Sequence, residues 1–496
     1  MANRYSFISL ALLAVAIFLN LYLFPAQALA QTQQYTVTDL GTLDGQGDSY
    51  AHGINSSGQV AGSTVTSGQE SNIRAFLYSR GLMKQLGTLG GIRSEASALN
   101  DAGQVVGHST IAGSSSAQEM NAFLYQDGVM TSLGTLPQDT GSFGFNINNS
   151  GQVVGASYKN VVNNSTFPPV TVRFEHAFLY SGGVMQDLSA LLGGAHSRAS
   201  GINDSGVVVG RFVFREDLPG CPHPFLYSGG TMTDLGALSG FPCSEAVAVN
   251  NFGEVIGVSR TQDTRSSRFF LYRGGVMHDL GNLGDRGSHA SDINNAGQIV
   301  GAIAPGGGTS FAFLYSDGTL LDLNSLIPAG SGWTLGSASN INDAGQIVGS
   351  GVHNGARRAY LLTPTVPTLI TEPNSDRALA LDSVTFVRDP FPVRTAHNFS
   401  DDGRTRVALF ARSVVLAPDE PTSVLTAQVE DMQHGVLTLP VEYVGKVHQF
   451  GWLTQIIVRL PEELEGGGDV KISIALRGVR SNSPIIGIKP AAGNVP

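Results

Sequence analysis

The feature that most constrains this chain is a nine-residue pattern that occurs seven times: an aliphatic residue followed by Asn-x-x-Gly-x-Val/Ile-x-Gly. Its asparagines are Asn55, Asn100, Asn148, Asn203, Asn250, Asn294 and Asn342. Asn-x-x-Gly favours a turn, because the Asn side chain bonds the backbone and Gly tolerates a positive φ. A spacing of 44 to 55 residues between these asparagines predicts a series of similar small units.

Each unit has four segments that are typical of strands. In chain order their approximate patterns are S-x-A-x-x-I-N, G-Q-V-V-G, A-F-L-Y and M-x-D-L-G. The middle two are short runs of branched or aromatic residues between turn residues, which is typical of strands. They are continuously apolar, which indicates sheets covered on both faces. Asp-Gly and Gly-Gly pairs between the third and fourth signals are residues of tight hairpins. Each unit is therefore predicted to be a four-stranded antiparallel meander.

A single sheet of about 45 residues with two apolar faces is not stable alone. Seven such sheets stacked face to face in a ring cover every face, which is the arrangement of a β-propeller. The sequence therefore predicts an all-β chain whose residues 35–364 form a seven-bladed β-propeller. An open stack or a β-helix is the alternative, although tight hairpins disfavour the parallel pairing of a β-helix.

The first and last units suggest how the ring closes. The region begins with "YTVTDLGTL" (residues 35–43), which matches the end of a unit, whereas the seventh unit stops at Pro364 without that strand. We therefore expect residues 37–40 to pair beside residues 359–362 and to complete the last blade. An open stack gives no reason for this strand count.

The repeats resemble the HAF family of bacterial extracellular repeats. "HAFLY" at 176–180 contains the triplet that names the family, and "GQVVG" and "LGTLGG" fit its pattern, although Tyr360 replaces Phe in the seventh repeat. The resemblance covers about residues 35–364. It implies an exported propeller protein, and it brings no catalytic residues to this chain.

A Pro/Thr-rich linker at residues 365–368 precedes a region, 369–490, of different composition. We predict an immunoglobulin-like β-sandwich there, because strand-like runs are separated by Pro- and Gly-rich turns. These runs are 383–387, 406–411, 423–430, 453–460 and 469–476. The region also resembles a C-terminal module of secreted proteins of soil bacteria, which implies spacing, attachment or stabilisation.

Residues 1–30 are typical of a signal peptide, with Arg4, a long apolar run and Ala-Leu-Ala before cleavage between Ala30 and Gln31. An uncleaved membrane anchor is the alternative, because the run is just long enough to span a bilayer. We expect a secreted, periplasmic or cell-surface protein with no membrane association after cleavage. A net charge of −10 without a basic cluster argues against nucleic-acid partners.

The chain has two cysteines, Cys221 and Cys243. Oxidation is favoured in an exported protein. One cysteine precedes the third strand of the fourth unit and the other follows its fourth strand, so a hairpin brings them to the same side. We predict a disulfide, with free thiols as the alternative.

No sequence motif of a hydrolase, phosphate-binding loop or metal site is present, and the histidines have no ligand spacing. We therefore expect no cofactor and no metal. The repeated asparagines could form a ring of ligands, but turn capping explains them better. The aspartates before "LG" could bind calcium, but a bond at a strand end is the preferred interpretation. They are Asp39, Asp187, Asp234, Asp279 and Asp322.

A ligand site is predicted where the first strands vary. Between the repeated Ser and Ala of these strands the residue changes from unit to unit, and it could line the mouth of the central channel. These candidate residues are Tyr50, Glu95, Phe143, Arg198, Glu245 and His289. Aromatic, acidic and basic side chains together suit a glycan or a peptide, and variable loops such as residues 157–175 would contribute. The alternative is a surface that simply tolerates change.

Two functions follow from these observations. The first is a non-enzymatic extracellular binding or scaffold protein that presents variable propeller loops. The second is a polysaccharide-active enzyme, a lyase or glycosidase, at the channel mouth. Such chemistry needs paired acid/base groups, and Glu95 and Glu245 are the only carboxylates among the six variable residues.

Overall fold

The computed structural model describes residues 35–489 apart from internal gaps. The gaps are 67–72, 115–118, 164–169, 194–195, 215–219, 264–265, 283–287, 306–307, 317, 373–374, 396–401, 415, 417–419, 432–434, 448–449, 466–467 and 477–478. The predicted signal peptide and its cleavage site between Ala30 and Gln31 lie outside the described residues. No helix in the described part is long and apolar enough to cross a membrane. Contacts divide the chain into two compact units, one of residues 37–342 and 346–362 and one mainly from residue 363 onward.

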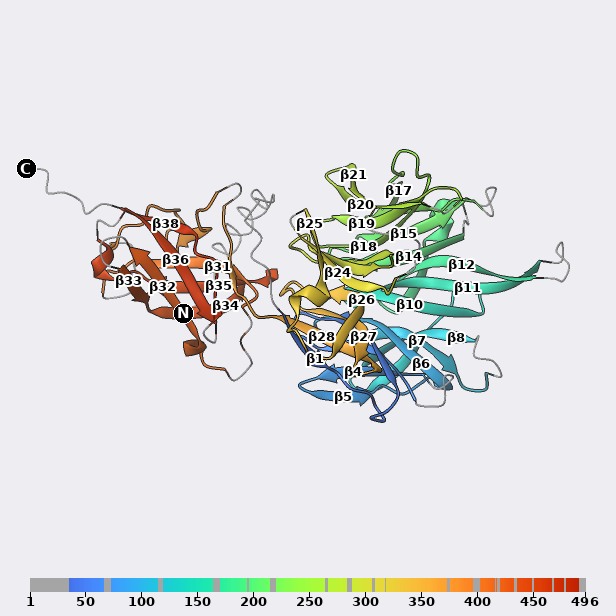
Figure 1. Ribbon diagram of the computed structural model, residues 1–496. Helices are drawn as coiled ribbons and strands as arrows, with labels where there is room; N and C mark the ends of the chain where they lie inside the picture. Colours follow the sequence, from blue (N-terminus) through green and yellow to red (C-terminus); the bar gives the residue numbers. More distant parts are fainter. Residues whose placement is uncertain are drawn as a thin grey trace, which may run out of the picture. The chain divides into compact units, whose positions relative to one another are not determined.

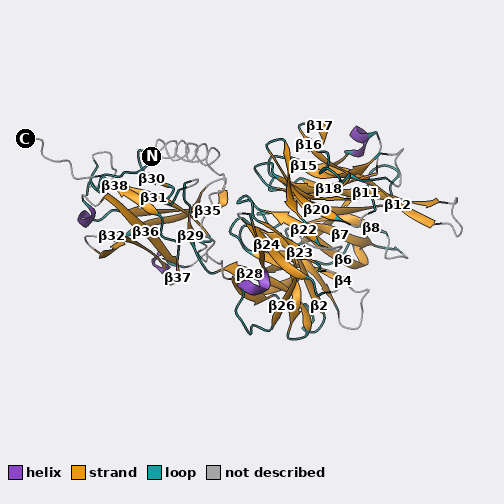
Figure 2. Ribbon diagram, turned by 45° about the horizontal axis from the view of Figure 1, so that its top comes forward, coloured by secondary structure: helices purple, strands orange, loops and turns teal. Residues whose placement is uncertain are grey.

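The first unit contains seven four-stranded antiparallel sheets in the part of the chain that is described (Figures 1 and 2). In six sheets the strands follow chain order, so each is a meander. The prediction of an all-β fold made of four-stranded antiparallel sheets is confirmed.

The first three sheets are β2 Asp48–Ile54, β3 Val60–Val65, β4 Ile73–Ser79, β5 Leu82–Gln85; β6 Gly90–Leu99, β7 Val105–Ile111, β8 Met120–Gln126, β9 Val129–Gly134; and β10 Gly141–Ile147, β11 Val153–Asn163, β12 Val170–Ser181, β13 Val184–Asp187. The next three are β14 His196–Ile202, β15 Val208–Val213, β16 His223–Ser228, β17 Thr231–Asp234; β18 Cys243–Val249, β19 Val255–Arg260, β20 Ser267–Arg273, β21 Val276–Gly281; and β22 His289–Ile293, β23 Ile299–Ile303, β24 Phe311–Ser316, β25 Thr319–Asp322. The seventh combines β26 Trp333–Ile341, β27 Ile347–His353 and β28 Ala356–Pro364 with β1 Tyr35–Asp39.

The core of this unit lies between neighbouring sheets. Phe123 on β8, for example, is fully buried in a cluster that includes Ala61 and Ala75 of the preceding sheet. The aromatic residue of every third strand is buried in the same way. These residues are Phe76, Phe123, Phe178, Phe225, Phe270, Phe313 and Tyr360. Both faces of a sheet therefore pack on other sheets, which explains why its middle strands are apolar throughout.

The N-terminal strand β1 is the outer strand of the seventh sheet, whose order is β1-β28-β27-β26. The backbone N–H of Leu40 donates to the carbonyl of Ala359 at 3.1 Å. Beside it, the Asp39 carboxylate lies 2.7 Å from Nδ1 of His353. Leu40 is buried in a cluster with residues of both the first and the seventh sheets. The first and last segments of this unit are thus bonded to each other.

Each repeated asparagine caps its own turn and also bonds the neighbouring sheet. In Asn148, Oδ1 accepts from the backbone N–H groups of Ser150 and Gln152, at 3.1 and 2.9 Å, which caps the turn. Its Nδ2 donates across to the carbonyl of Asn203 in the next sheet, at 3.0 Å. The same bond links every asparagine to the next one, and Asn342 donates to the carbonyl of Asn55 at 2.9 Å. The sequence predicted the cap but missed this circle of bonds between sheets.

The first strand of every sheet contains a β-bulge, an extra residue without a partner on the second strand. In β2, for example, Ala51 pairs with Gly62 and Gly53 with Ala61, so His52 is left over. The bulged residues are His52, Ser97, Phe145, Ser200, Val247, Ser291 and Ser339.

The glycine that ends each G-Q-V-V-G signal is required by close backbone approach at this bulge. A Cβ on Gly107 would collide with the carbonyl oxygen of Glu95, and the equivalent glycines meet the equivalent carbonyl. They are Gly62, Gly107, Gly155, Gly210, Gly257, Gly301 and Gly349.

We predict that Gly107→Ala lowers the free energy of unfolding by about 2 kcal/mol, because the added methyl group must displace backbone. Denaturant unfolding measures the effect. Gly336→Ala is the matched control, since the nearest atom to its added Cβ is the Ser350 carbonyl at 3.6 Å. Equal stability of the two variants would contradict the close approach.

The second unit is a sandwich of two five-stranded sheets. One sheet has the order β29-β31-β35-β34, with β30 also paired to β31; the other has the order β33-β32-β36-β37, with β38 also paired to β36. The strands are β29 Thr368–Leu369, β30 Ala380–Asp382, β31 Arg406–Arg412, β32 Leu425–Asp431, β33 Gly435–Leu439, β34 Val441–Val447, β35 Phe450–Arg459, β36 Gly468–Leu476, β37 Val479–Arg480 and β38 Ile485–Ile488. One buried core contains residues of both sheets, such as Leu409 and Ile456 of the first and Val429 and Ile472 of the second.

One strand prediction for this unit is wrong. Residues 383–387 read as a strand from their β-branched and aromatic residues, but they form a turn. The Asp382 carboxylate accepts hydrogen bonds from the N–H groups of Val384 and Thr385, at 3.0 and 2.7 Å. Such an Asx turn overrides strand propensity.

Candidate functional site

A cavity of about 410 Å³ lies within the first unit, a size common for ligand sites. All seven bulged residues line it, one from the first strand of each sheet. A bulge changes the direction of a side chain, which in a regularly paired strand would follow the alternation of the pleat. The bulges therefore supply the wall of this cavity.

The structure brings two of the six predicted site residues to the cavity. Arg198 and Glu245 are among its lining residues. The other four are not part of the lining: they are Tyr50, Glu95, Phe143 and His289. The prediction chose the variable position two residues before the bulge. The first strand has one residue more than the stretch of the second strand that pairs with it. Comparing the lengths of these two stretches in the sequence would have revealed the extra residue.

Glu95 belongs to a separate group of charges. Arg93 donates from Nε to its Oε1 at 2.9 Å, and Nε2 of His108 lies 3.7 Å from the same oxygen. Burial alone would raise the pKa of Glu95, but His108 and Arg93 together hold that pKa at about 2. His108 also contacts the edge of the Phe143 ring, with centroids 4.9 Å apart. Glu95 is thus ionised at neutral pH, in an ion pair with Arg93.

Glu245 is paired with arginines of two neighbouring strands. Nη1 of Arg260 on β19 lies 2.6 Å from its Oε1, and Nη1 of Arg211 on β15 lies 3.6 Å from its Oε2. Arg211 lines the cavity beside Arg198. The cavity thus has two guanidinium groups close to one carboxylate, and that carboxylate already has another partner outside the lining.

Arg198 is held against an aromatic ring. Its guanidinium carbon is 3.9 Å from the centroid of Phe145, a bulged residue of the preceding sheet, which is a cation–π distance. Burial lowers the pKa of Arg198. The side chain remains charged at neutral pH, as arginine does throughout proteins.

The other repeated polar residues have structural partners. Each strand-end aspartate accepts from a backbone N–H two residues later, at 2.7 to 2.8 Å, as the preferred interpretation predicted. In four first strands the repeated serine accepts a hydrogen bond from the backbone N–H of an alanine in the neighbouring sheet, for example from Ala122 to Ser142 Oγ at 2.9 Å. Among the described residues, no group of three or more His, Cys, Asp or Glu side chains could hold a metal ion.

The long connection at residues 157–175 is different from the loop expected. β11 and β12 continue through most of it as a paired hairpin, with Tyr158 opposite Glu175 and Asn163 opposite Val170. Figure 1 shows the two strands reaching beyond their neighbours. Valines at 161, 162, 170 and 172 explain the extension, because β-branched residues favour strands.

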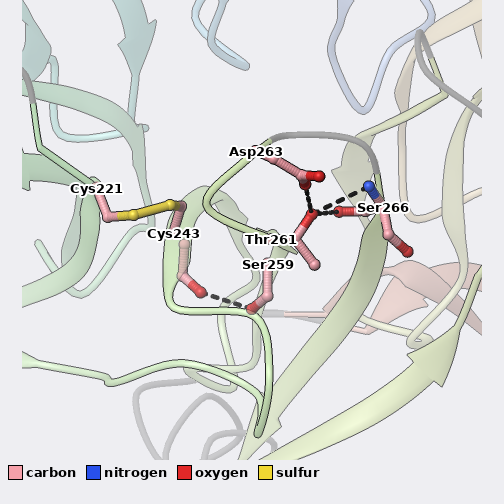
Figure 3. Close-up of a disulfide and its surroundings, with 7 residues drawn as sticks. Cys221, Cys243, Ser259, Thr261, Asp263 and Ser266 are labelled. Carbon is pink, nitrogen blue, oxygen red and sulfur yellow. Dashed lines mark hydrogen bonds between the residues drawn. A yellow bond between two sulfur atoms is a disulfide. The ribbon is translucent and has the colours of Figure 1, made fainter.

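Cys221 and Cys243 form a disulfide, with their Cα atoms 4.4 Å apart (Figure 3). Cys243 is the first residue of β18, so the bond ties the segment before β16 to the next sheet. In the same close-up, Thr261 binds Asp263 and Ser266 in the loop after β19.

We predict that the double substitution Cys221→Ser, Cys243→Ser lowers the free energy of unfolding by about 3 kcal/mol, the value for a closed loop of this order. Thermal unfolding measures the loss. Mass spectrometry after alkylation provides the check: both thiols should react only after reduction. Alkylation of the untreated protein would contradict the disulfide.

Comparison with known families gives one match. A model described as "Protein of unknown function (DUF3466)" matches residues 233–434, which is less than half of the chain. That region includes the last sheets of the first unit and the start of the second. No curated protein matches the sequence.

Solved structures give distant likenesses. TolB from Acinetobacter baumannii has a TM-score of 0.32 and 13% identity, covering 58% of this chain and 75% of its own. An acylaminoacyl peptidase from Pyrococcus horikoshii has a TM-score of 0.41 and 10% identity, and the likeness covers 77% of this chain and 60% of the peptidase. Prolyl oligopeptidase B from Galerina marginata has a TM-score of 0.33 and 8% identity, and the likeness covers 84% of this chain and 55% of the peptidase. This chain therefore spans less than two thirds of either peptidase.

Proposed function

We propose that this chain is an exported bacterial binding protein without enzymatic activity. Its first unit is a seven-bladed β-propeller closed by the N-terminal strand, with the ligand site in its central cavity. Its second unit is an immunoglobulin-like sandwich that serves for spacing or attachment.

The ring architecture is supported by two independent bonds between the ends of the unit. One is the pairing of β1 with β28, and the other is the hydrogen bond from Asn342 to the carbonyl of Asn55. A ring places its first and last blades side by side, as these bonds require. The order of the sandwich strands supports the immunoglobulin-like assignment, because β29-β31-β35-β34 corresponds to A-B-E-D and β33-β32-β36-β37 to C′-C-F-G.

The observation that carries the binding function is the composition of the cavity wall. A side chain from each first strand lines the cavity, and the bulged residue changes from His52 to Phe145 to Val247 while the supporting turns stay constant. A rigid frame with variable residues around a hollow is typical of binding sites.

The state of the two candidate carboxylates supports binding over catalysis. A glycosidase needs one carboxylic acid that can donate a proton and a second carboxylate nearby. The pKa of Glu95 is held at about 2, so it carries no proton to donate at neutral pH. Glu245 is occupied by Arg260 and Arg211.

Glycan and peptide arrays probed with purified residues 31–496 test the proposal. We expect binding to a restricted set of ligands, and no binding to any of them would overturn the function. A parallel assay measures depolymerisation of plant and microbial glycans. Release of reducing ends or unsaturated products would instead establish the enzyme alternative.

A further inference from the structure

We infer that the cavity binds acidic sugars, with the sugar carboxylate held between the guanidinium groups of Arg198 and Arg211. This inference rests on the proposed binding function and goes further by naming the ligand class. Nothing in the family match or the distant structural likenesses assigns a ligand to these residues.

The guanidinium group of Arg198 has hydrogen-bond donors that no other described residue accepts. Its guanidinium group forms no hydrogen bond or ion pair with any other residue that the structure describes, although it carries five N–H donors. The contact with Phe145 holds the group in place without using those donors. A fixed, partly buried guanidinium with free donors is suited to a bidentate bond with a carboxylate.

Arg198 and Arg211 are also direct partners across the strand pair β14–β15. Like charges directly opposite each other destabilise a sheet, so two arginines at this register are unfavourable without an anion. Glu245 meets Arg211 at 3.6 Å, but its shorter bond, 2.6 Å, goes to Arg260. A ligand carboxylate between the two cavity arginines would remove the repulsion.

The surrounding charges leave this side of the cavity positive. Arg173 and Glu175, which are not lining residues, also act on Arg198 electrostatically, with opposite signs, and Arg260 is paired with Glu245, so the charge cluster around Arg198 has four arginines and two glutamates. Asp292 is a second acidic lining residue, but it lies on β22 and accepts a hydrogen bond from the backbone of Ile341 at 3.1 Å. A positive patch in a chain of net charge −10 favours an anionic ligand group.

The remaining wall favours a sugar over a peptide. Four of the seven bulged residues are serines, and two amides, Asn146 and Asn340, are also part of the lining. Hydroxyl and amide groups match the many hydroxyls of a sugar ring. The large apolar side chains of the lining are Phe145 and Val247, and the other apolar ones are the small Ala98, Ala246 and Ala248, so the wall offers little apolar surface to peptide side chains.

Calorimetric titration of purified residues 31–496 with oligogalacturonate of defined length tests the inference. The matched ligand is the same oligosaccharide with every carboxylate methyl-esterified, which keeps the sugar chain and removes the charge. We expect the ester to bind at least about ten-fold more weakly, as the loss of a charged hydrogen bond predicts. Added salt should weaken the acidic ligand only.

Variants locate the carboxylate. Arg198→Gln and Arg211→Gln should each weaken oligogalacturonate binding about ten- to a hundred-fold, and Arg198→Lys should weaken it less because the charge remains. Arg268→Gln is the matched control: it removes one arginine that is bonded to Asp279 and does not line the cavity. Unchanged melting temperatures establish that each variant is folded.

The outcomes separate the two proposals. Equal affinity for acid and ester, or full affinity in both arginine variants, overturns the acidic-sugar inference. Binding of neutral glycans alone, or of peptides through a free terminal carboxylate alone, overturns it too but leaves the binding function standing. No binding of any glycan or peptide overturns both.

Discussion

Removal of residues 31–43 is expected to lower the free energy of unfolding of the first unit by about 5 kcal/mol or more. Leu40 alone is 4% exposed, and loss of such a buried side chain costs about 3 kcal/mol. The deletion also removes the hydrogen bonds of β1 to β28, worth about 1 kcal/mol each. It exposes the edge of β28, including the fully buried Ala359.

Thermal unfolding of residues 44–496 against 31–496 measures this effect, and we expect a melting temperature roughly 10 °C lower. A synthetic peptide of residues 31–43 should restore part of the loss, because it binds only the folded form. A scrambled peptide is the control. The single substitution Leu40→Ala should destabilise, whereas Leu82→Ala should not, since Leu82 is 75% exposed. If the shortened protein melts like the complete one, the closed ring is wrong.

The substitution Asn148→Asp is expected to cost about 3 kcal/mol, the penalty of a buried group whose partner is lost. It retains Oδ1, so the turn keeps its cap. It replaces the amide nitrogen with an oxygen that faces the carbonyl of Asn203, at 3.0 Å, and Oε1 of Gln152, at 2.8 Å. The loss therefore reports the two bonds of Nδ2, one to the next sheet and one to Gln152, and not the cap formed by Oδ1.

The same variant has a defined pH dependence. Burial and two facing oxygens raise the pKa of the new carboxyl group in the folded state above its unfolded value. The penalty is therefore full above the folded pKa and shrinks as pH falls towards the unfolded value, because the protonated acid can donate again. Urea unfolding at several pH values measures this trend. Asn160→Asp, at an exposed position of β11, is the control, and equal stability of the two variants would contradict the bond.

Much of the fold could be predicted because the repeat expresses physical requirements of single positions. The turn asparagine, the apolar middle strands and the hairpin glycines each determine local structure, and seven copies reinforce the interpretation. The strand predicted wrongly at residues 383–387 lies outside the repeats. There the hydrogen bonds of the Asp382 carboxylate to the backbone stabilise a turn, although the five residues have a high strand propensity. A single unrepeated segment offers no second copy against which to test its pattern.

The site was harder to predict because its geometry depends on register. Variation between repeats pointed to Arg198 and Glu245, but the same criterion also selected Tyr50 and His289, which do not line the cavity. The bulge determines which residue of the first strand lines the cavity. It can be recognised only when the first strand is aligned with the second. The bonds between asparagines were missed for the same reason, since they join residues about one repeat apart.

Under the proposed binding function, the bulges would also separate ligand recognition from stability. In β2, β10, β14, β18 and β22 the pairing with the second strand continues on both sides of the bulge, whereas β6 and β26 have a second irregularity. A substitution at one of these positions alters one portion of the wall and leaves the hydrogen-bond ladder intact. Seven such positions can therefore change independently of one another. Under the proposed function, single substitutions at these positions, one repeat at a time, would change the specificity and leave the scaffold unchanged.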